Sequence, residues 1–203
     1  MQRIAIVDTG MCNVDSMQRA IEECGAKADV TSNPTDLDYA DKIVLPGVGA
    51  FPDAMDLLNR SGLTDAIQSN VIDHEVPILG VCLGMQLLTS QSVEVRLTTG
   101  LNLIDARVER LVPITNERVP HVGWNEAHQS SDHGLFGGIA SGTDFYFVHS
   151  FHVVCDGQFV VATTPYCGTL ISAIGSEHIM GTQFHPEKSQ AAGLALLHNF
   201  VTL

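Results

Sequence analysis

The sequence has little positive charge. Its 203 residues include 10 Lys and Arg against 23 Asp and Glu, for a formal net charge of −13. Binding to a nucleic-acid backbone relies on clustered cations, so this balance argues against nucleic acid as a partner. An acidic chain can still bind a small anion at one local site, or dock onto a basic protein face.

Long apolar runs are also missing. No stretch approaches the ~18 uninterrupted apolar residues of a membrane-spanning helix, and the opening segment becomes acidic at Asp8, too early for a signal peptide. The five cysteines (12, 24, 82, 155 and 167) form no Cys-x-x-Cys pair, and their odd number leaves one thiol unpaired in any disulfide scheme. We therefore expect a soluble, cytoplasmic protein with reduced thiols.

The sequence does contain short apolar runs that alternate with helical patterns. Residues 3–8, 42–46 and 76–82 are nearly continuous apolar runs, and apolar residues at helical spacing follow each of them. Strands of this kind, separated by helices, are typical of a parallel sheet buried on both faces. Beyond residue 101 the segments look like strands without long helices between them: 103–112, 119–124, 145–154, 159–163 and 169–174.

These patterns predict an α/β fold. We expect a largely parallel central sheet, flanked by helices and continued by an antiparallel extension, with a final helix over residues 191–200. No linker, internal repeat or low-complexity tract divides the chain. Residues 1–203 are therefore predicted to form one domain.

Cys82 lies where an apolar run changes to a helical pattern, between Gly80 and Gly84. Taken alone, a cysteine among apolar residues is most often a small buried hydrophobe. The Gly-x-Cys-x-Gly spacing, however, has the form of a nucleophile elbow, a sharp strand-to-helix turn whose neighbours must be small. Such a turn places the sulfur at a helix N-terminus, where N–H groups and the helix dipole favour the thiolate.

A thiol nucleophile needs a base, and the base needs a group that orients it. His185 ends a strand-like run, and Pro186 turns the chain so that His185 and Glu187 can lie along one line. Glu187 would then fix the imidazole tautomer while the other ring nitrogen faces the thiol. The alternative is a surface turn in which Glu187 pairs with Lys188, and spacing alone does not choose between the two.

No metal site and no cofactor are predicted. His149 and His152 are close in sequence, but a three-residue offset along one strand points them to opposite faces. The three converging ligands of a catalytic zinc are not visible in the sequence.

The two motifs together resemble those of the class I, or triad, glutamine amidotransferases, an α/β family with a flavodoxin-like sheet. A Gly-x-Cys-x-Gly-x-Gln elbow spans residues 80–86, and a late His-Pro-Glu spans 185–187. Finer features resemble one group within this family, the HisH-type glutaminase subunits of imidazole glycerol phosphate synthase. The segments that carry this resemblance are 8–10, 45–51, 120–125, 146–150 and 183–189.

The resemblance implies hydrolysis of glutamine to glutamate and ammonia. Cys82 would attack the side-chain carboxamide, His185 would protonate the departing ammonia and then activate water, and Glu187 would orient His185. The oxyanion donors implied are backbone N–H groups of Leu83, Gly47, Val48 and Gly49. The substrate contacts implied are Gln86 and Glu94, which would hold the α-amino and α-carboxylate end, together with Ser150 and Phe151.

The resemblance also implies a partner, a HisF-type cyclase subunit with a (β/α)8 barrel. In a heterodimer this subunit would receive the ammonia and form imidazole glycerol phosphate and an aminoimidazole carboxamide ribotide in histidine biosynthesis. The interface residues implied are Asn13, Trp124, Tyr146 and Lys188. Two alternatives stay open: a glutaminase subunit of another triad amidotransferase, and a catalytically silent ligand-sensing module on the same fold.

Overall fold

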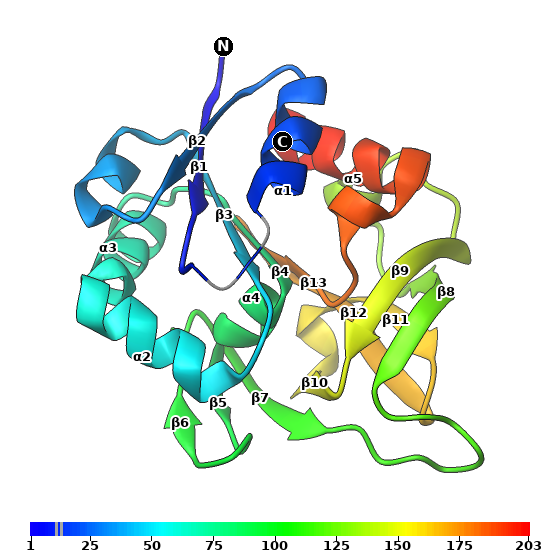
Figure 1. Ribbon diagram of the computed structural model, residues 1–203. Coiled ribbons are helices and arrows are strands. Elements are labelled where there is room, and N and C mark those ends of the chain that lie inside the picture. The colour runs from blue at the N-terminus through cyan, green and yellow to red at the C-terminus, as the bar shows by residue number, and fades with distance from the viewer. Residues whose placement is uncertain (11, 13) are drawn as a thin grey trace.

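The computed structural model describes residues 1–10, 12 and 14–203 (Figure 1). The helices are α1 (Val14–Glu23), α2 (Phe51–Ser61), α3 (Leu63–Gln68), α4 (Leu83–Leu87) and α5 (Gln190–Thr202), with short helical turns η1 (Pro34–Tyr39), η2 (Ser69–Asp73), η3 (Gly134–Phe136), η4 (Gly157–Phe159) and η5 (Pro186–Lys188). Among the described residues, none of these helices is long and apolar enough to cross a membrane.

The strands form two sheets. They are β1 (Arg3–Val7), β2 (Lys27–Thr31), β3 (Lys42–Gly47), β4 (Ile78–Cys82), β5 (Thr89–Ser92), β6 (Thr98–Thr99), β7 (Ile104–Arg110), β8 (His121–Gln129), β9 (Thr143–His149), β10 (Phe151–Cys155), β11 (Val160–Pro165), β12 (Thr169–Ser176) and β13 (Ile179–Thr182). Within the described residues, the larger sheet has nine strands in the order β2-β1-β3-β4-β13-β12-β11-β8-β9.

The larger sheet is parallel on one side and antiparallel on the other. Strands β2, β1, β3, β4 and β13 pair in parallel, whereas β12, β11, β8 and β9 continue the sheet with antiparallel pairings. This arrangement confirms the predicted fold class. The pairing of β13 with β4 was not predicted, and it brings the end of the chain beside the Cys82 strand.

Helices cover both faces of the parallel strands (Figure 1). In β1, Ile4 and Ile6 belong to the apolar core beneath α1 and α5, whereas Ala5 and Val7 belong to the core beneath α2 and α3. Successive side chains of a strand point to opposite faces, so a strand buried on both sides must be apolar at every position. The nearly continuous apolar runs of the sequence have this origin.

The second sheet corrects one expectation. The segment 145–154 was expected to be a single strand, but it breaks at Ser150 into β9 and β10. Strand β9 is the edge of the nine-stranded sheet, whereas β10 belongs to a four-stranded sheet in the order β10-β7-β5-β6. His149 and His152 therefore lie on strands of different sheets, and the argument from alternation along one strand was wrong.

Candidate active site

Cys82 stands at the turn between β4 and α4. Its backbone has φ 56° and ψ −109°, a conformation that residues other than glycine rarely adopt. A Cβ atom at Gly80 would lie 2.6 Å from the carbonyl oxygen of Gly84, and one at Gly84 would overlap the carbonyl oxygen of Leu45. Both glycines are thus needed for the turn to close, as the elbow motif predicts.

The helix after the elbow is short. Helix α4 has 5 residues, so few peptide dipoles line up behind the Cys82 sulfur. The expected contribution of a helix dipole to the thiolate is correspondingly small. Nearby charges and hydrogen-bond donors must supply most of any activation of the thiol.

His185 and Glu187 form a buried pair. The imidazole Nδ1 of His185 donates to Oε1 of Glu187 at 2.8 Å, and the two side chains are 4% and 7% exposed. Strand β13 runs parallel to β4 with Thr182 opposite Val81, which carries the following His185 towards Cys82. The predicted pairing of His185 with Glu187 therefore describes the geometry, and the surface-turn alternative does not.

The charge state of His185 follows from its neighbours. Burial lowers the pKa of His185, but the neighbouring Cys82 sulfur and Glu187 carboxylate outweigh burial and raise it to about 9. Among the described residues, Nε2 of His185 has no hydrogen-bond partner. A protonated imidazole at this position is suited to stabilise a thiolate and to give a proton to a leaving group.

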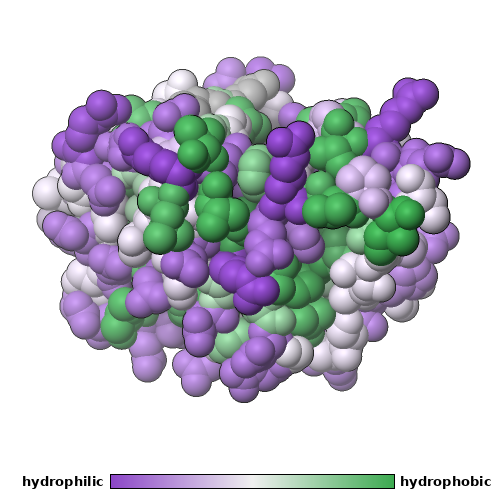
Figure 2. Space-filling view, turned by 90° about the horizontal axis from the view of Figure 1, so that it is seen from below, coloured by the Kyte–Doolittle hydropathy of each residue, from purple (hydrophilic) through white to green (hydrophobic). Residues whose placement is uncertain are grey.

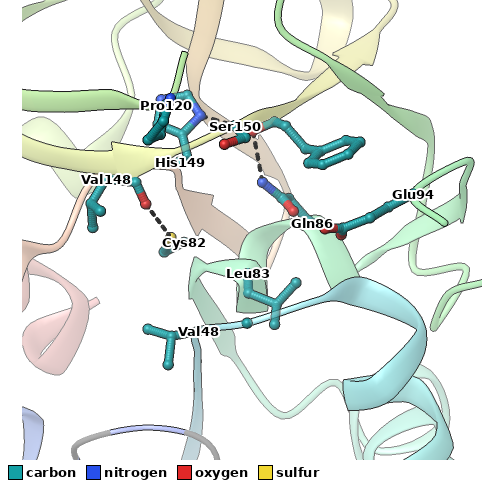
Figure 3. A pocket seen from close by; sticks show the side chains of 11 residues that line it. Val48, Cys82, Leu83, Gln86, Glu94, Pro120, Val148, His149 and Ser150 are labelled. Carbon is teal, nitrogen blue, oxygen red and sulfur yellow. Dashed lines mark hydrogen bonds between the residues drawn. The ribbon is translucent and has the colours of Figure 1, made fainter. Parts of the chain in front are cut away.

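The Cys82 sulfur has two polar neighbours besides the triad. It lies 3.8 Å from the carbonyl oxygen of Val148, to which the thiol can donate (Figure 3). It also accepts a hydrogen bond from Nε2 of Gln183 at 3.7 Å. In the thiol form, the S–H group can donate to the Val148 carbonyl, whereas the charge interaction with His185 belongs to the thiolate form.

A pocket of about 280 Å³ opens beside the sulfur (Figure 3). Residues expected to act on the substrate or its oxyanion line it: Val48, Gly49, Cys82, Leu83, Gln86, Glu94, Ser150 and Phe151. Gly47 does not line this pocket. It lies opposite Cys82 in the pairing of β3 with β4 and borders a small separate cavity with His185 and Glu187.

Gln86 offers the pocket only an acceptor. Its Nε2 donates to the carbonyl oxygen of Phe151 at 2.9 Å and to Oε1 of Gln183 at 2.9 Å, which uses both hydrogens of the amide. The amide oxygen remains, and an oxygen can accept from an ammonium group but cannot donate to a carboxylate. The α-amino and α-carboxylate groups of glutamine were both expected at Gln86, and the geometry supports a contact with the α-amino group alone.

Glu94 links the pocket to helix α2. Its Oε2 accepts a hydrogen bond from the backbone N–H of Phe51 at 2.8 Å, so the carboxylate caps the first turn of α2. That helix begins directly after the segment that carries Val48 and Gly49. The same carboxylate lines the pocket, where it can face a cation.

The expected interface residues gather near the triad. Trp124 and Tyr146 are cross-strand partners on β8 and β9, with ring centroids 6.0 Å apart, and Trp124 is 47% exposed. Lys188 borders the small cavity that His185 and Glu187 share. Asn13 lies outside the described residues.

The site end of the molecule carries apolar side chains in separate groups among polar ones (Figure 2). This view looks from below in Figure 1, where β5, β6 and β7 lie. Exposed apolar side chains of the segments next to these strands are Val93, Val95, Leu97, Val112 and Ile114. Together with Trp124, they give the chain apolar surface that a partner could cover.

Four residues of the site were not predicted. Gln183 contacts the sulfur, and Pro120, Val148 and His149 line the pocket. All four lie in segments that carried the family resemblance, which was the only available signal. Their contacts depend on strand pairings far apart in sequence, so no local pattern distinguishes them.

Comparisons with known proteins agree with this geometry. The family model for glutamine amidotransferase class-I matches residues 5–203. Subunit HisH 1 of imidazole glycerol phosphate synthase from Campylobacter jejuni is 42% identical over 200 residues, which cover 98% of this chain and 100% of that protein. The chain belongs to the HisH subunits of the class-I glutamine amidotransferase family.

Other HisH subunits support the assignment. Subunit HisH from Moorella thermoacetica is 44% identical over 98% of this chain and 94% of its own length, and that from Methanosarcina mazei is 44% identical over 100% of both.

Solved structures agree on the fold. PurLQS from Thermotoga maritima has a TM-score of 0.77 at 17% identity, over 100% of this chain and 99% of that one. A glutamine amidotransferase from Thermotoga maritima has a TM-score of 0.67 at 17% identity, over 92% of this chain and 76% of that one.

Proposed function

We propose that the chain, as one amidotransferase domain over residues 1–203, is the glutaminase subunit of imidazole glycerol phosphate synthase. The observation that carries this proposal is the strained Cys82 elbow beside the buried His185–Glu187 pair, with a pocket sized for a small molecule at the sulfur. HisH relatives at 42% to 44% identity support the choice of reaction and pathway.

The chemistry assigns one role to each member of the triad. The Cys82 thiol gives its proton to Nε2 of His185, and the sulfur attacks the carboxamide carbon of glutamine. The carbon–nitrogen bond then breaks, ammonia leaves with the proton from His185, and a thioester to Cys82 remains. Water gives a proton to His185 and attacks the thioester, glutamate leaves, and the sulfur recovers its proton. Glu187 holds Nδ1 throughout, so that Nε2 is the nitrogen that moves protons.

The oxyanion that forms on the carboxamide oxygen needs donors next to the sulfur. The N–H of Leu83 follows Cys82 directly, and Val48 and Gly49 border the same pocket. Each such donor is worth about 3 to 4 kcal/mol of barrier. Gly47 has no Cβ atom, so the Gly47–Val48 peptide that follows it can rotate at less steric cost than after any other residue. We expect the Gly47–Val48 peptide to flip into the donating orientation when the enzyme is activated.

Partner binding would act close to the catalytic turn. The carbonyl oxygen of Tyr146 accepts a hydrogen bond from the N–H of His185 at 2.9 Å, and the N–H of Tyr146 donates to Oγ of Ser189 at 3.0 Å. A cyclase subunit that contacts Trp124, Tyr146 and Lys188 would therefore contact strand β9 and turn η5, which hold His185 in place. Asn13 completes the proposed interface. Direct transfer between subunits would keep ammonia from being protonated in water.

The test measures glutaminase activity in three mixtures. The purified chain is assayed alone, with a HisF-type cyclase subunit, and with that subunit plus its ribonucleotide substrate. We expect almost no glutamate from the chain alone, strong stimulation in the complete mixture, and no activity from Cys82→Ala in any mixture.

Each contrary outcome has a distinct meaning. Equal glutaminase activity with and without the cyclase would refute partner dependence. A folded chain that is inactive in the complete mixture, and that forms no covalent adduct with a glutamine-like electrophile, would point to a silent binding module. Stimulation by the synthase of another triad amidotransferase, but not by the cyclase, would reassign the pathway.

A further inference from the structure

Gln183 is fully buried, contacts the Cys82 sulfur, and has no part in the triad chemistry. It follows β13 directly, and its backbone N–H donates to the carbonyl oxygen of Ser172 at 2.9 Å, which fixes the main chain. A buried amide must have its donors and acceptor paired, because an unpaired group costs about 1 to 3 kcal/mol. The question is which end of the Gln183 amide faces the sulfur.

The neighbours of Gln183 decide its orientation. The carbonyl oxygen of Phe151 can only accept, so the atom of Gln86 that lies 2.9 Å from it must be the nitrogen. The same nitrogen lies 2.9 Å from the Gln183 side chain, which must therefore present its oxygen there. The nitrogen of Gln183 is left to face Cys82, so the sulfur receives an N–H donor.

His149 binds the Phe151 carbonyl oxygen from the other side, and His121 binds His149 in turn. Nδ1 of His149 lies 2.8 Å from this oxygen and must carry a hydrogen, so Nε2 of a neutral His149 accepts. Nδ1 of His121 lies 3.0 Å from that Nε2 and donates to it. Nδ2 of Asn125 in turn donates to Nε2 of His121 at 3.3 Å. The carbonyl oxygen of Phe151 therefore fixes the tautomers of both His149 and His121.

The histidine pair stays neutral at ordinary pH. Burial lowers the pKa of His121 to about 4 and that of His149 to about 3, while the rings of Phe147 and Tyr166 stack on His121. Protonation would put a hydrogen on Nε2 of His149 and break its bond to His121. The low pKa values keep the donor pattern constant over the range in which the enzyme works.

We propose that Gln183 is a positioning residue for the nucleophile, whose side-chain N–H holds the Cys82 sulfur in the thiolate form. Gln86 and the Phe151 carbonyl set its direction, and the His149–His121 pair fixes that carbonyl. A donor binds a charged sulfur more strongly than a neutral one. The neutral thiol can donate to the Val148 carbonyl, and ionisation removes this hydrogen bond. The hydrogen bond from Gln183 to the thiolate compensates for that loss. This inference rests on the proposed function only in taking Cys82 as the nucleophile.

The first test removes the donor and keeps the shape. Gln183→Met has similar length without polar hydrogens, and Gln183→Glu keeps an acceptor for Gln86 but loses the N–H. Iodoacetamide is added to the full chain over a range of pH, and alkylation of the Cys82 peptide is followed by mass spectrometry, which separates it from the other thiols. We expect the pH midpoint of Cys82 alkylation to rise by about one unit in Gln183→Met, and further in Gln183→Glu.

The second test separates the two nitrogens of His149. In His149→Asn the amide nitrogen can take the place of Nδ1 and donate to Phe151, whereas in His149→Gln it takes the place of Nε2 and cannot. We expect a raised alkylation midpoint in His149→Gln and a midpoint near that of wild type in His149→Asn. His152→Gln, the same substitution on a half-buried histidine outside this hydrogen-bond chain, is the control and should leave the midpoint unchanged.

Urea unfolding confirms that each variant is folded before it is compared. Unchanged alkylation midpoints in folded Gln183→Met and Gln183→Glu would overturn the proposal, and equal midpoints in the two His149 variants would overturn the part assigned to the histidine pair. Alkylation needs no glutamine, so a chain that shows these shifts but never hydrolyses glutamine would refute the proposed function and leave the role of Gln183 standing.

Discussion

Replacing Cys82 by glycine should stabilise the fold relative to replacing it by alanine. Both substitutions remove the sulfur and so abolish glutaminase activity. They differ in the Cβ atom, which alanine keeps and glycine lacks. At φ 56° and ψ −109° that atom is the source of strain in the elbow.

The size of the difference follows from two opposing terms. A residue held in so rarely populated a backbone conformation costs about 1 to 3 kcal/mol. Glycine removes this strain but loses about 0.5 to 1 kcal/mol more than alanine in chain entropy on folding. We therefore expect Cys82→Gly to be more stable than Cys82→Ala by about 1 kcal/mol. For a urea m-value of about 2 kcal/mol/M, the unfolding midpoint should be higher by about 0.5 M.

Urea unfolding of the two variants at one pH, followed by far-UV circular dichroism, measures this difference. Ala5→Gly supplies the control, because Ala5 is buried in β1 and has a negative φ. There the same loss of a methyl group should lower the midpoint. If Cys82→Ala equals or exceeds Cys82→Gly in stability, the elbow does not store strain at the nucleophile, and the interpretation of its backbone is wrong.

Three further predictions concern stability. Gly84→Ala should lose about 3 kcal/mol or more in urea unfolding, because its Cβ would overlap the carbonyl oxygen of Leu45; a loss below about 1 kcal/mol would contradict the close packing. Below pH 6.5, His121 and His149 are protonated in the unfolded chain but stay neutral in the folded protein. The free energy of unfolding should therefore fall, as the pH is lowered, by up to about 1.4 kcal/mol per pH unit for each histidine, and His121→Phe should flatten this slope. His185 has a folded pKa of about 9 and should contribute up to about 3 kcal/mol to the free energy of unfolding. This contribution is fully present below pH 6.5 and is lost as the pH rises through 9, so His185→Gln should lack this part of the alkaline slope.

The two halves of the candidate site, the Cys82 turn and the His185–Glu187 pair, could be predicted because the geometry of each is local. Gly80 and Gly84 make the turn at Cys82 possible, and Pro186 begins the helical turn η5 directly after His185, which brings Glu187 back to the imidazole. The fold class followed in the same way from strands that are apolar at every position. Helix α4 was expected to help the thiolate through its dipole, but its length of 5 residues leaves that argument weak, because residue periodicity does not show where a short helix stops.

Strand pairing decided what the local patterns could not. The break at Ser150 sends β9 and β10 into different sheets, and this break puts Val148, His149 and the Phe151 carbonyl around the pocket. The orientation of the Gln183 amide depends on Gln86, which is 97 residues away in the chain. Hydrogen bonds of this kind involve groups with no preferred spacing, so the sequence carries no periodic signal for them.

The sequence by itself determined the elbow at Cys82 and the alternation of strands and helices, because glycine, proline and apolar residues act on the backbone within a few positions. Only the tertiary structure decided how the thiol is held: its S–H faces Val148, an N–H of Gln183 faces the sulfur, and His185 comes to it because β13 pairs with β4. A hydrogen bond requires contact at about 3 to 4 Å, and contacts between distant segments exist only after the sheet has formed.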